Sequence, residues 1–271
     1  MSTEILSLQF TPIKADKIAN LNKAKLLIEN TCKKNYDLIV FPEFFDTGIN
    51  ITNEEIYELA EEEKNSIIID NLSDLAKTYN SYIHCGAICF KEKDKIYNRT
   101  YLLDRKGEIV VKYNKIHLFN YFGGNEGSYT TAGETLSVVN ADFGKIGLAT
   151  CFDIRFPQMF YQLTKMGAEL FVLPATWQVF NKISETEKTQ FINNWQLMNK
   201  ARAFDNVAFF VSANEVGQTH PLFTGIGNSM IVNYDGSVLA QADNIETAIY
   251  AQLDFPALRK ARKAFPVGQL S

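Results

Sequence analysis

The sequence lacks the features that mark secreted and membrane proteins. No run approaches the roughly 18 apolar residues that a membrane-spanning helix requires. The stretch from Met1 to Phe10 has no basic start followed by an apolar core and a cleavage site, so we expect no signal peptide. These absences predict a cytoplasmic protein whose few cysteines are free thiols. The cysteines are Cys32, Cys85, Cys89 and Cys151.

A surplus of positive charge is also missing. Lys and Arg number 27 against 31 Asp and Glu, which gives a net charge of −4 and a pI near 5.5. Domains that bind nucleic acid usually carry a basic surface, so this balance argues against DNA or RNA as a partner. The pairs Gly123-Gly124 and Gly144-x-x-Gly147 do not form a phosphate-binding loop or a dinucleotide fingerprint. We therefore expect no cofactor.

The spacing of cysteine and histidine does not predict a metal site. His84, Cys85 and Cys89 lie close together, but the residues among them are apolar and the short two-cysteine loop of a zinc site is missing. Alternation along an extended segment puts Cys85 and Cys89 on one face of a single strand. Both cysteines are expected to lie in the core, and no metal is expected.

Apolar runs with strand character alternate with helical patterns along the whole chain. With 46% hydrophobic and 21% charged residues, the composition is that of a globular protein. No linker, repeat or low-complexity tract divides residues 1–271, which predicts a single domain. Because each sheet must bury a face, we predict an α/β fold in which two sheets pack together with helices outside.

The predicted elements follow from the period of the apolar residues. Strands are predicted over 5–10, 38–41, 82–90, 96–104, 109–112, 136–139, 146–150, 169–173, 207–212, 229–233, 237–240 and 249–253. Helices are predicted over 15–33, 54–79 in two pieces broken near Asn65, 156–165, 188–204 and 256–263.

Three predicted strands each end at a reactive side chain. Glu43 follows the run 38–41, Lys115 follows the strand 109–112, and Cys151 follows the strand 146–150. Strand ends in α/β folds are common places for sites, because a rigid sheet aims the loops. Each residue alone also fits a structural role, as a core cysteine, a loop carboxylate or a lysine whose stem packs on the strand. Together they predict an active site.

The neighbours of each residue indicate its chemistry. Cys151 lies at a strand-to-helix junction, where the positive end of the helix lowers a thiol pKa and favours a nucleophile. Glu43 is followed by Phe44 and Phe45, so burial should raise its pKa, as suits a general base that later acts as an acid. Lys115, among apolar neighbours, is suited to stabilise an oxyanion.

Three segments carry a resemblance to a known family. They are Phe41-Pro42-Glu43-Phe44-Phe45, Tyr113-Asn114-Lys115-Ile116-His117-Leu118-Phe119 and Cys151-Phe152-Asp153-Ile154-Arg155-Phe156-Pro157. In order and approximate spacing they resemble the signature segments of the nitrilase superfamily of carbon–nitrogen hydrolases. The resemblance implies a four-layer α-β-β-α sandwich with two packed mixed β-sheets. It also implies a catalytic Glu-Lys-Cys triad, which falls on Glu43, Lys115 and Cys151.

The same resemblance implies a supporting glutamate. It falls on Glu126, shortly before Gly133-Glu134, and would position the lysine and the substrate. The loop 120–127 is shorter than in many members, and Asn120 stands where many have Asp. Hydrolysis would pass through a cysteine thioester, with the backbone N–H of Phe152 helping the lysine to hold the oxyanion.

The triad does not fix the substrate. The segment that begins at Cys151 is similar to that of omega-amidases, which hydrolyse 2-oxoglutaramate and 2-oxosuccinamate, so we expect a small carboxylate-bearing amide. N-carbamoyl amidases and deaminated-glutathione amidases are the alternatives. Candidate substrate contacts are Trp177, as a wall of the pocket, Arg155, for a carboxylate, and His117. Trp177 could equally pack under the long helix, and Arg155 could form a structural ion pair. Family membership also implies a homodimer.

Two other functions stay open at this point. A Cys-His hydrolase would use Cys151 with His117 and would not need Glu43. A non-catalytic family member would bind a ligand without turnover, although the intact triad argues against it.

Overall fold

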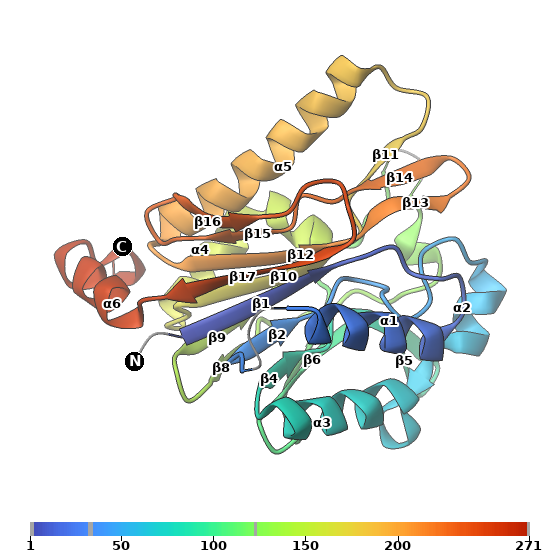
Figure 1. Cartoon of the computed structure of the whole chain (residues 1–271), viewed down its shortest axis with the longest axis horizontal. Helices are drawn as coiled ribbons and strands as arrows, with labels where there is room; N and C mark the ends of the chain where they lie inside the picture. The colour runs from blue at the N-terminus through green and yellow to red at the C-terminus, as the bar shows by residue number, and fades with distance from the viewer. Residues whose placement is uncertain (1–2, 32–34, 122–123, 270–271) are drawn as a thin grey trace.

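Two β-sheets lie face to face, and helices cover the outer face of each (Figure 1). The computed structural model describes residues 3–31, 35–121 and 124–269. The four layers confirm the predicted α-β-β-α sandwich.

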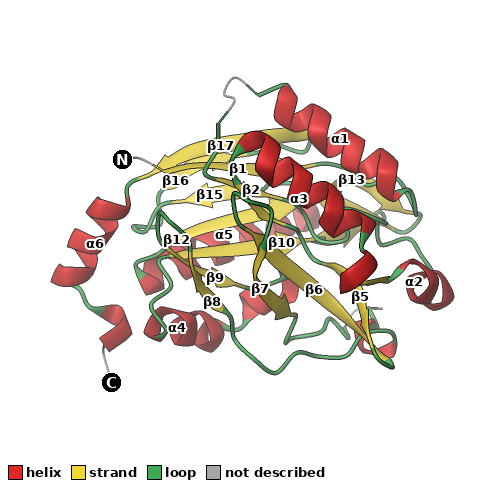
Figure 2. Ribbon diagram, turned by 90° about the horizontal axis from the view of Figure 1, so that it is seen from below, coloured by secondary structure: helices red, strands yellow, loops and turns green. Residues whose placement is uncertain are grey.

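The first sheet has eight strands in the order β17-β1-β2-β4-β6-β5-β3, with β7 paired to β6. It is mixed, since β1, β2 and β4 run parallel while β17 and β6 are antiparallel to their neighbours. Helices α1 (Lys17–Glu29) and α3 (Ile67–Tyr79) cover its outer face (Figure 2). The strands are β1 (Thr3–Gln9), β2 (Leu38–Val40), β3 (Glu61–Glu62), β4 (Tyr82–His84), β5 (Ile88–Glu92), β6 (Lys95–Leu103), β7 (Ile109–Asn114) and β17 (Thr247–Leu253).

The second sheet has six strands in the order β16-β15-β12-β10-β9-β8. Helices α4 (Pro157–Lys165) and α5 (Glu185–Asn206) lie on its outer face. The strands are β8 (Val138–Asn140), β9 (Lys145–Leu148), β10 (Leu170–Ala175), β12 (Phe209–Asn214), β15 (Met230–Val232) and β16 (Val238–Gln241).

Shorter elements surround the two sheets. A three-stranded sheet, which the sequence analysis missed, has the order β11-β14-β13. The remaining elements are β11 (Gln178–Phe180), β13 (Val216–His220), β14 (Phe223–Ile226), α2 (Asn53–Leu59), α6 (Phe255–Ala264) and the 3₁₀ helices η1 (Glu63–Asn65), η2 (Glu126–Ser128), η3 (Cys151–Arg155) and η4 (Val267–Gln269).

Central strands are apolar on both faces because they separate two cores. Leu38 and Val40 of β2 belong to the core that includes the second sheet, and Ile39 belongs to the core under α1 and α3. All three are fully buried. Alternate residues of a strand point to opposite faces, so a strand covered on both sides reads as a continuous apolar run.

The prediction of one strand over 82–90 was wrong. The segment forms two strands, β4 and β5, with Gly86 between them at a φ of +60°. A Cβ on Gly86 would lie 2.0 Å from the carbonyl oxygen of Pro42, so only glycine allows this close approach. Cys85 therefore lies in a loop and does not share a strand face with Cys89.

Cysteines in the described ranges form no disulfide: Cys85, Cys89 and Cys151 are free, and Cys32 lies outside those ranges. Within the same ranges, no three His, Cys, Asp or Glu side chains form a group that could hold a metal ion. No helix that the structure describes is both long and apolar enough to span a bilayer.

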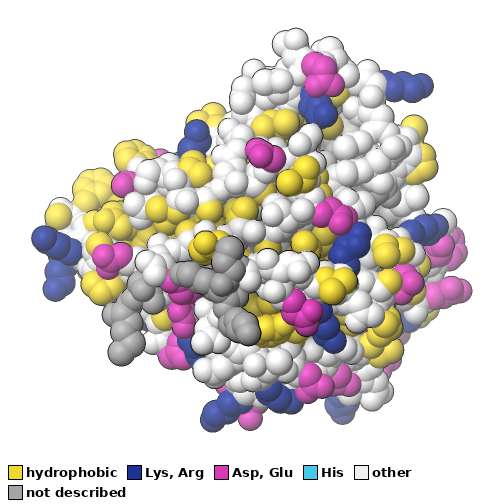
Figure 3. Space-filling model, in the orientation of Figure 1, with side chains coloured by type: hydrophobic (Ala, Val, Ile, Leu, Met, Phe, Trp, Pro, Cys, Tyr) yellow, Lys and Arg dark blue, Asp and Glu magenta, His cyan; other side chains and the backbone are white. Residues whose placement is uncertain are grey.

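On the face seen in the space-filling view, side chains of one kind gather in two regions. Lys and Arg side chains gather at the tip formed by α6, which carries Arg259, Lys260, Arg262 and Lys263 (Figure 3). Hydrophobic side chains lie over β16 and β17, where Val238 and Leu239 are each 41% exposed (Figure 3).

Candidate active site

Glu43, Lys115 and Cys151 meet just beyond the ends of β2, β7 and β9. The Nζ atom of Lys115 lies 3.0 Å from Oε1 of Glu43. The thiol of Cys151 is hydrogen-bonded to the same carboxylate. Relative exposure is 0% for Glu43, 2% for Lys115 and 8% for Cys151, so Cys151 is the residue of this group most open to solvent. The structure thus brings together three side chains from distant parts of the sequence.

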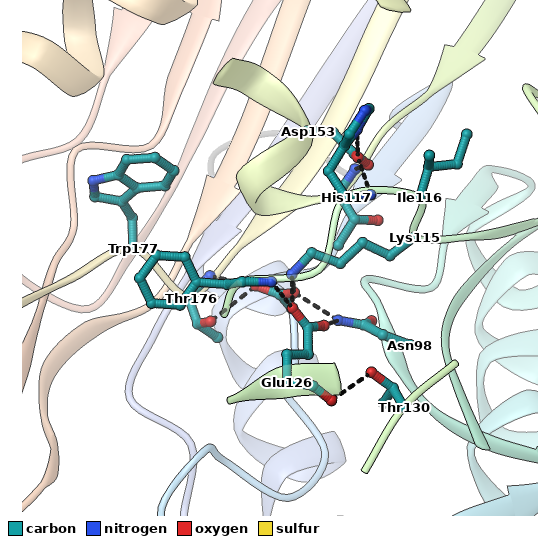
Figure 4. Close-up of polar contacts among 12 residues, drawn as sticks. Asn98, Lys115, Ile116, His117, Glu126, Thr130, Asp153, Thr176 and Trp177 are labelled. Atoms are coloured by element: carbon teal, nitrogen blue, oxygen red, sulfur yellow. Dashed lines mark hydrogen bonds and ion pairs between the residues drawn. The ribbon is translucent and has the colours of Figure 1, made fainter. Parts of the chain in front are cut away.

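Glu126 joins this group from η2. Its Oε2 accepts hydrogen bonds from Nζ of Lys115 at 2.8 Å and from the backbone N–H of Phe119 at 2.7 Å. Figure 4 shows Lys115 and Glu126 pointing toward each other, with Thr130 on the far side of Glu126. Asn120 helps to shape this loop, because its Oδ1 accepts the backbone N–H of Gly127 at 2.8 Å. The ammonium therefore lies between two carboxylates.

Two further side chains, which sequence reasoning missed, complete the polar contacts of Glu43. Asn98 of β6 donates through Nδ2 to Oε1 of Glu43 and to Oε1 of Glu126, both at 2.8 Å. Thr176, just after β10, donates to Oε2 of Glu43 from its backbone N–H at 2.9 Å and its hydroxyl at 2.8 Å. The available signal for Asn98 was a run of polar residues, 98–100, within a strand that is otherwise apolar and buried.

The prediction that Glu43 has a raised pKa was wrong. Burial alone would raise the pKa of this carboxyl, but the Lys115 ammonium and hydrogen bonds from Cys151 and Asn98 outweigh burial and bring the pKa below its ordinary value. The carboxylates of Glu126 and Glu43 in turn hold the pKa of Lys115 well above its ordinary value, although burial opposes them. Glu43 is ionised and Lys115 is protonated at neutral pH.

The expectation of a lowered thiol pKa was also wrong. Burial and the Glu43 carboxylate raise the pKa of Cys151 well above its ordinary value, and they outweigh Lys115 and a backbone hydrogen bond from Thr176. The expected helix N-terminus is not directly beside the sulfur, since the five-residue η3 begins at Cys151 and α4 begins only at Pro157. The thiol proton therefore stays on sulfur at rest, next to an ionised carboxylate.

Asp153 ties the turn that carries the thiol to the segment that carries the ammonium. Its Oδ2 accepts the backbone N–H of Thr150 at 2.8 Å and the hydroxyl of Tyr113 at 2.6 Å. Its Oδ1 accepts the backbone N–H of His117 at 3.0 Å and lies 2.7 Å from Nδ1 of the same residue. The fully buried carboxylate thus fixes the two segments relative to each other.

His117 contacts Asp153, and its ring stacks on Phe156 with centroids 3.5 Å apart. Figure 4 shows the His117 side chain directed toward Asp153. Over the ranges that the structure covers, His117 makes no hydrogen bond with Cys151. These contacts favour a supporting role for His117 and argue against a Cys-His pair.

The other predicted contacts lie around this centre. Trp177 is partly exposed next to Thr176 (Figure 4). Its ring centroid lies 5.2 Å from that of Trp195 on α5. Arg155 is exposed at the end of η3 and, within the described part of the chain, has no ion pair. The ring of Phe152 packs against Phe119 at 5.3 Å, beside the thiol turn.

Known proteins share both the sequence pattern and the fold. The pattern of the family described as carbon–nitrogen hydrolase matches residues 6–263. The chain is 31% identical to nitrilase homolog 2 of Dictyostelium discoideum, covering 93% of this chain and 75% of that protein. It is 30% identical to a 2-oxoglutaramate amidase of Paenarthrobacter nicotinovorans, covering 98% and 84%. The crystal structure of Saccharomyces cerevisiae Nit3, a nitrilase superfamily member of branch 10, superposes with a TM-score of 0.84 at 25% identity, covering 98% and 94%.

The chain belongs to the carbon–nitrogen hydrolase family. The family match extends from the first strand into α6, so it includes all the elements that carry the buried Glu-Lys-Cys group.

Proposed function

We propose that this chain hydrolyses a small carboxylate-bearing amide to the acid and ammonia through a thioester on Cys151. The observation that carries the proposal is the contact between the ionised Glu43 carboxylate, the Cys151 thiol and the Lys115 ammonium in one buried group. The substrate class is the ω-amide of a 2-oxo dicarboxylic acid, such as 2-oxoglutaramate or 2-oxosuccinamate. Relatives named omega-amidase and 2-oxoglutaramate amidase support that class.

The first half of the reaction forms the thioester. Glu43 takes the proton from Cys151 as the sulfur attacks the amide carbon, so the high thiol pKa is overcome by transfer to a hydrogen-bonded base. The carbonyl oxygen becomes an oxyanion held by Lys115 and the backbone N–H of Phe152; such donors each contribute about 3 kcal/mol. When the carbon–nitrogen bond breaks, Glu43 returns the proton to the leaving ammonia.

The second half releases the acid. Glu43 removes a proton from water, whose oxygen attacks the thioester carbon, and the carbon–sulfur bond breaks. The proton then returns to the sulfur of Cys151, so the enzyme is restored and the net reaction is amide plus water to acid plus ammonia. In this scheme Glu126 holds the Lys115 ammonium in place throughout both halves.

The substrate carboxylate requires a cation other than Lys115. Arg155 is our candidate, because it is exposed four residues after the nucleophile and no ion pair within the described ranges occupies it. Trp177 is the proposed wall of the pocket. Replacing Arg155 by Leu should raise the KM for a carboxylate-bearing amide and leave that for a neutral amide unchanged.

A panel of substrates tests this assignment. Ammonia release would be measured with 2-oxoglutaramate, 2-oxosuccinamate, deaminated glutathione, carbamoylputrescine and a simple nitrile, with Cys151→Ala as the blank. We expect the two ω-amides to give the highest kcat/KM. A preference for carbamoylputrescine would instead assign the chain to the N-carbamoyl amidases, and a preference for deaminated glutathione to the deaminated-glutathione amidases. If no compound is turned over, a ligand-binding role is favoured.

We also propose that residues 1–271 act as one catalytic domain, in the cytoplasm and as a homodimer. Three large apolar side chains on α5 support the dimer: Phe191, Leu197 and Phe204 are 44%, 61% and 64% exposed. Arg202 of α5 donates to the carbonyl oxygen of Ile154 at 2.9 Å, so a partner on this helix would brace the thiol segment. Light scattering should give twice the chain mass, and the double change Leu197→Glu and Phe204→Glu should give a monomer.

A further inference from the structure

The two carboxylates of the site share two donors. The Nζ atom of Lys115 lies 3.0 Å from Glu43 and 2.8 Å from Glu126. Nδ2 of Asn98 lies 2.8 Å from an oxygen of each. The four groups therefore form a closed ring in which acceptors and donors alternate. Figure 4 shows three of them, Asn98, Lys115 and Glu126. One ammonium faces two carboxylates, and the second bridge comes from a neutral amide.

The orientation of the Asn98 amide follows from its surroundings. An ionised carboxylate only accepts hydrogen bonds, so the NH₂ group of Asn98 must face the carboxylates and its carbonyl must point away. Oδ1 of Asn98 is buried and has no hydrogen-bond partner among the residues that the structure describes, and the residue is 1% exposed. The described residues thus accept hydrogen bonds from the side-chain NH₂ group of Asn98 but donate none to its carbonyl oxygen. This difference indicates that the site requires the NH₂ group as a donor.

The backbone of the same residue holds the lysine. The backbone N–H of Lys115 donates to the carbonyl oxygen of Asn98 at 2.9 Å. Asn98 also shares the inward face of β6 with Leu102, which packs in the core between the sheets. One residue on a rigid central strand therefore contacts three members of the site, Glu43, Lys115 and Glu126.

We propose that Asn98 is a positioning residue of this site, whose side-chain amide fixes the spacing of Glu43 and Glu126 and so keeps the Lys115 ammonium aimed at the oxyanion. Without this bridge, the two carboxylates would repel each other with only one shared donor between them. Glu43 would also lose a hydrogen bond that favours its ionised form. The inference rests on the proposed hydrolysis and adds to it a residue outside the Glu-Lys-Cys triad.

Two variants and one control separate positioning from folding. Asn98→Leu removes the amide at similar volume, and Asn98→Asp keeps the shape but replaces the donors with a third carboxyl. Thr100→Val is the control, because Thr100 is fully buried two residues along the same face of β6 and contacts His84 at 3.3 Å. Each variant would be measured for kcat, KM and pH profile on the best amide, per folded protein determined by thermal unfolding.

For Asn98→Leu we expect kcat to fall about 100-fold with KM within about threefold, because a small misplacement of reacting groups has that effect. The acidic limb of the pH profile of this variant should move to higher pH, since the pKa of Glu43 rises when the hydrogen bond from the Asn98 amide is lost. Activity of Asn98→Asp should increase as the pH falls from about 8 to about 6, because a protonated carboxyl regains a donor. Thr100→Val should keep the wild-type kcat and pH profile.

The inference would be overturned if Asn98→Leu kept a wild-type kcat and pH profile per folded enzyme, or if Thr100→Val lost as much activity as Asn98→Leu. Acylation of Cys151 by p-nitrophenyl acetate gives a readout that does not depend on the natural amide. If the wild type hydrolyses no amide, the proposed function fails. The burst of p-nitrophenol that accompanies acylation of Cys151 still decides the role of Asn98 in that case. A burst of equal rate in wild type and Asn98→Leu would refute it.

Discussion

Thr176 donates two hydrogen bonds to one carboxylate oxygen of Glu43, from its backbone N–H at 2.9 Å and from its hydroxyl at 2.8 Å. Glu43 lies beyond β2 of the first sheet, and Thr176 follows β10 of the second. The carboxylate is therefore held across the interface of the two sheets. Its placement depends on how the sheets pack as well as on its own loop.

Removing one of these two donors should lower activity without disrupting the fold. Thr176→Val keeps the backbone N–H and loses the hydroxyl. A hydrogen bond to a charged group contributes about 1.5 to 3 kcal/mol, so we expect kcat/KM to fall by about tenfold or more. Thr164→Val is the matched control, because Thr164 is a buried threonine of α4 whose hydroxyl bonds to Phe160 and Asn206. Equal activity of Thr176→Val and wild type would contradict the role of Thr176.

The expected pH profile of activity follows from the directions in which the pKa values of Glu43 and Lys115 are shifted. The proposed mechanism needs ionised Glu43, whose pKa lies below its ordinary value, and protonated Lys115, whose pKa lies well above its ordinary value. We expect kcat/KM to be level between about pH 6 and about pH 9 and to fall only in acid, as Glu43 gains a proton. The stability from Glu43 has the same sign: it is present above the unfolded-state pKa and is lost as pH falls through the lower folded-state pKa. Loss of activity in His117→Ala, with activity kept in Glu43→Gln, would instead indicate a Cys-His site.

Asp46 predicts a separate effect of pH on stability. This buried residue lies just past the Glu43 turn, and burial raises the pKa of its carboxyl from 3.8 to about 6. The folded state then binds more protons than the unfolded state between these pH values, so the free energy of unfolding falls as pH rises from about 4 to about 6. Asp46→Asn should remove this slope and add up to about 3 kcal/mol at pH 7.5, as measured by urea unfolding. A variant less stable than wild type at that pH would contradict the prediction.

Asp153 should matter for both stability and turnover. Its carboxylate accepts from Thr150, Tyr113 and His117, and Asp153→Asn replaces one acceptor oxygen with a donor that faces other donors. We expect a loss of about 3 kcal/mol in the free energy of unfolding, together with a lower kcat per folded enzyme. Asp142→Asn is the control, since Asp142 is 52% exposed in its pair with Arg105 and such pairs contribute about 1 kcal/mol or less. Similar losses in the two variants would argue against a special role for Asp153.

Local pattern was enough to predict the parts of the fold where a short apolar run ends at a reactive residue. Residues 38–41 before Glu43 and residues 146–150 before Cys151 are all buried, so their apolar composition identifies them. The strands β13 and β14 were missed because Gly217 and Gly225 interrupt their alternation and the strands are only half buried. The turn at Gly86 could not be predicted, since it depends on a close approach to Pro42, which lies in the segment that follows β2.

The directions of the pKa shifts in the site could not be predicted from the residues that are neighbours in the sequence. Phe44 and Phe45 indicated a desolvated Glu43, but the pKa is set by Lys115, which lies 72 residues away. Asn98 and Thr176 were missed for the same reason, because strand order within the first sheet brings Asn98 to Glu43 and packing of the two sheets brings Thr176 to the same carboxylate.

Peptide mapping of the acyl-enzyme tests the central claim most directly. The protein would be mixed with the best amide of the panel, quenched in acid within one turnover and examined by mass spectrometry. We predict the acyl group of the substrate on Cys151 in the wild type, with no adduct and no ammonia release in Cys151→Ala. An acyl group on another residue, or ammonia release by Cys151→Ala at the wild-type rate, would contradict the account.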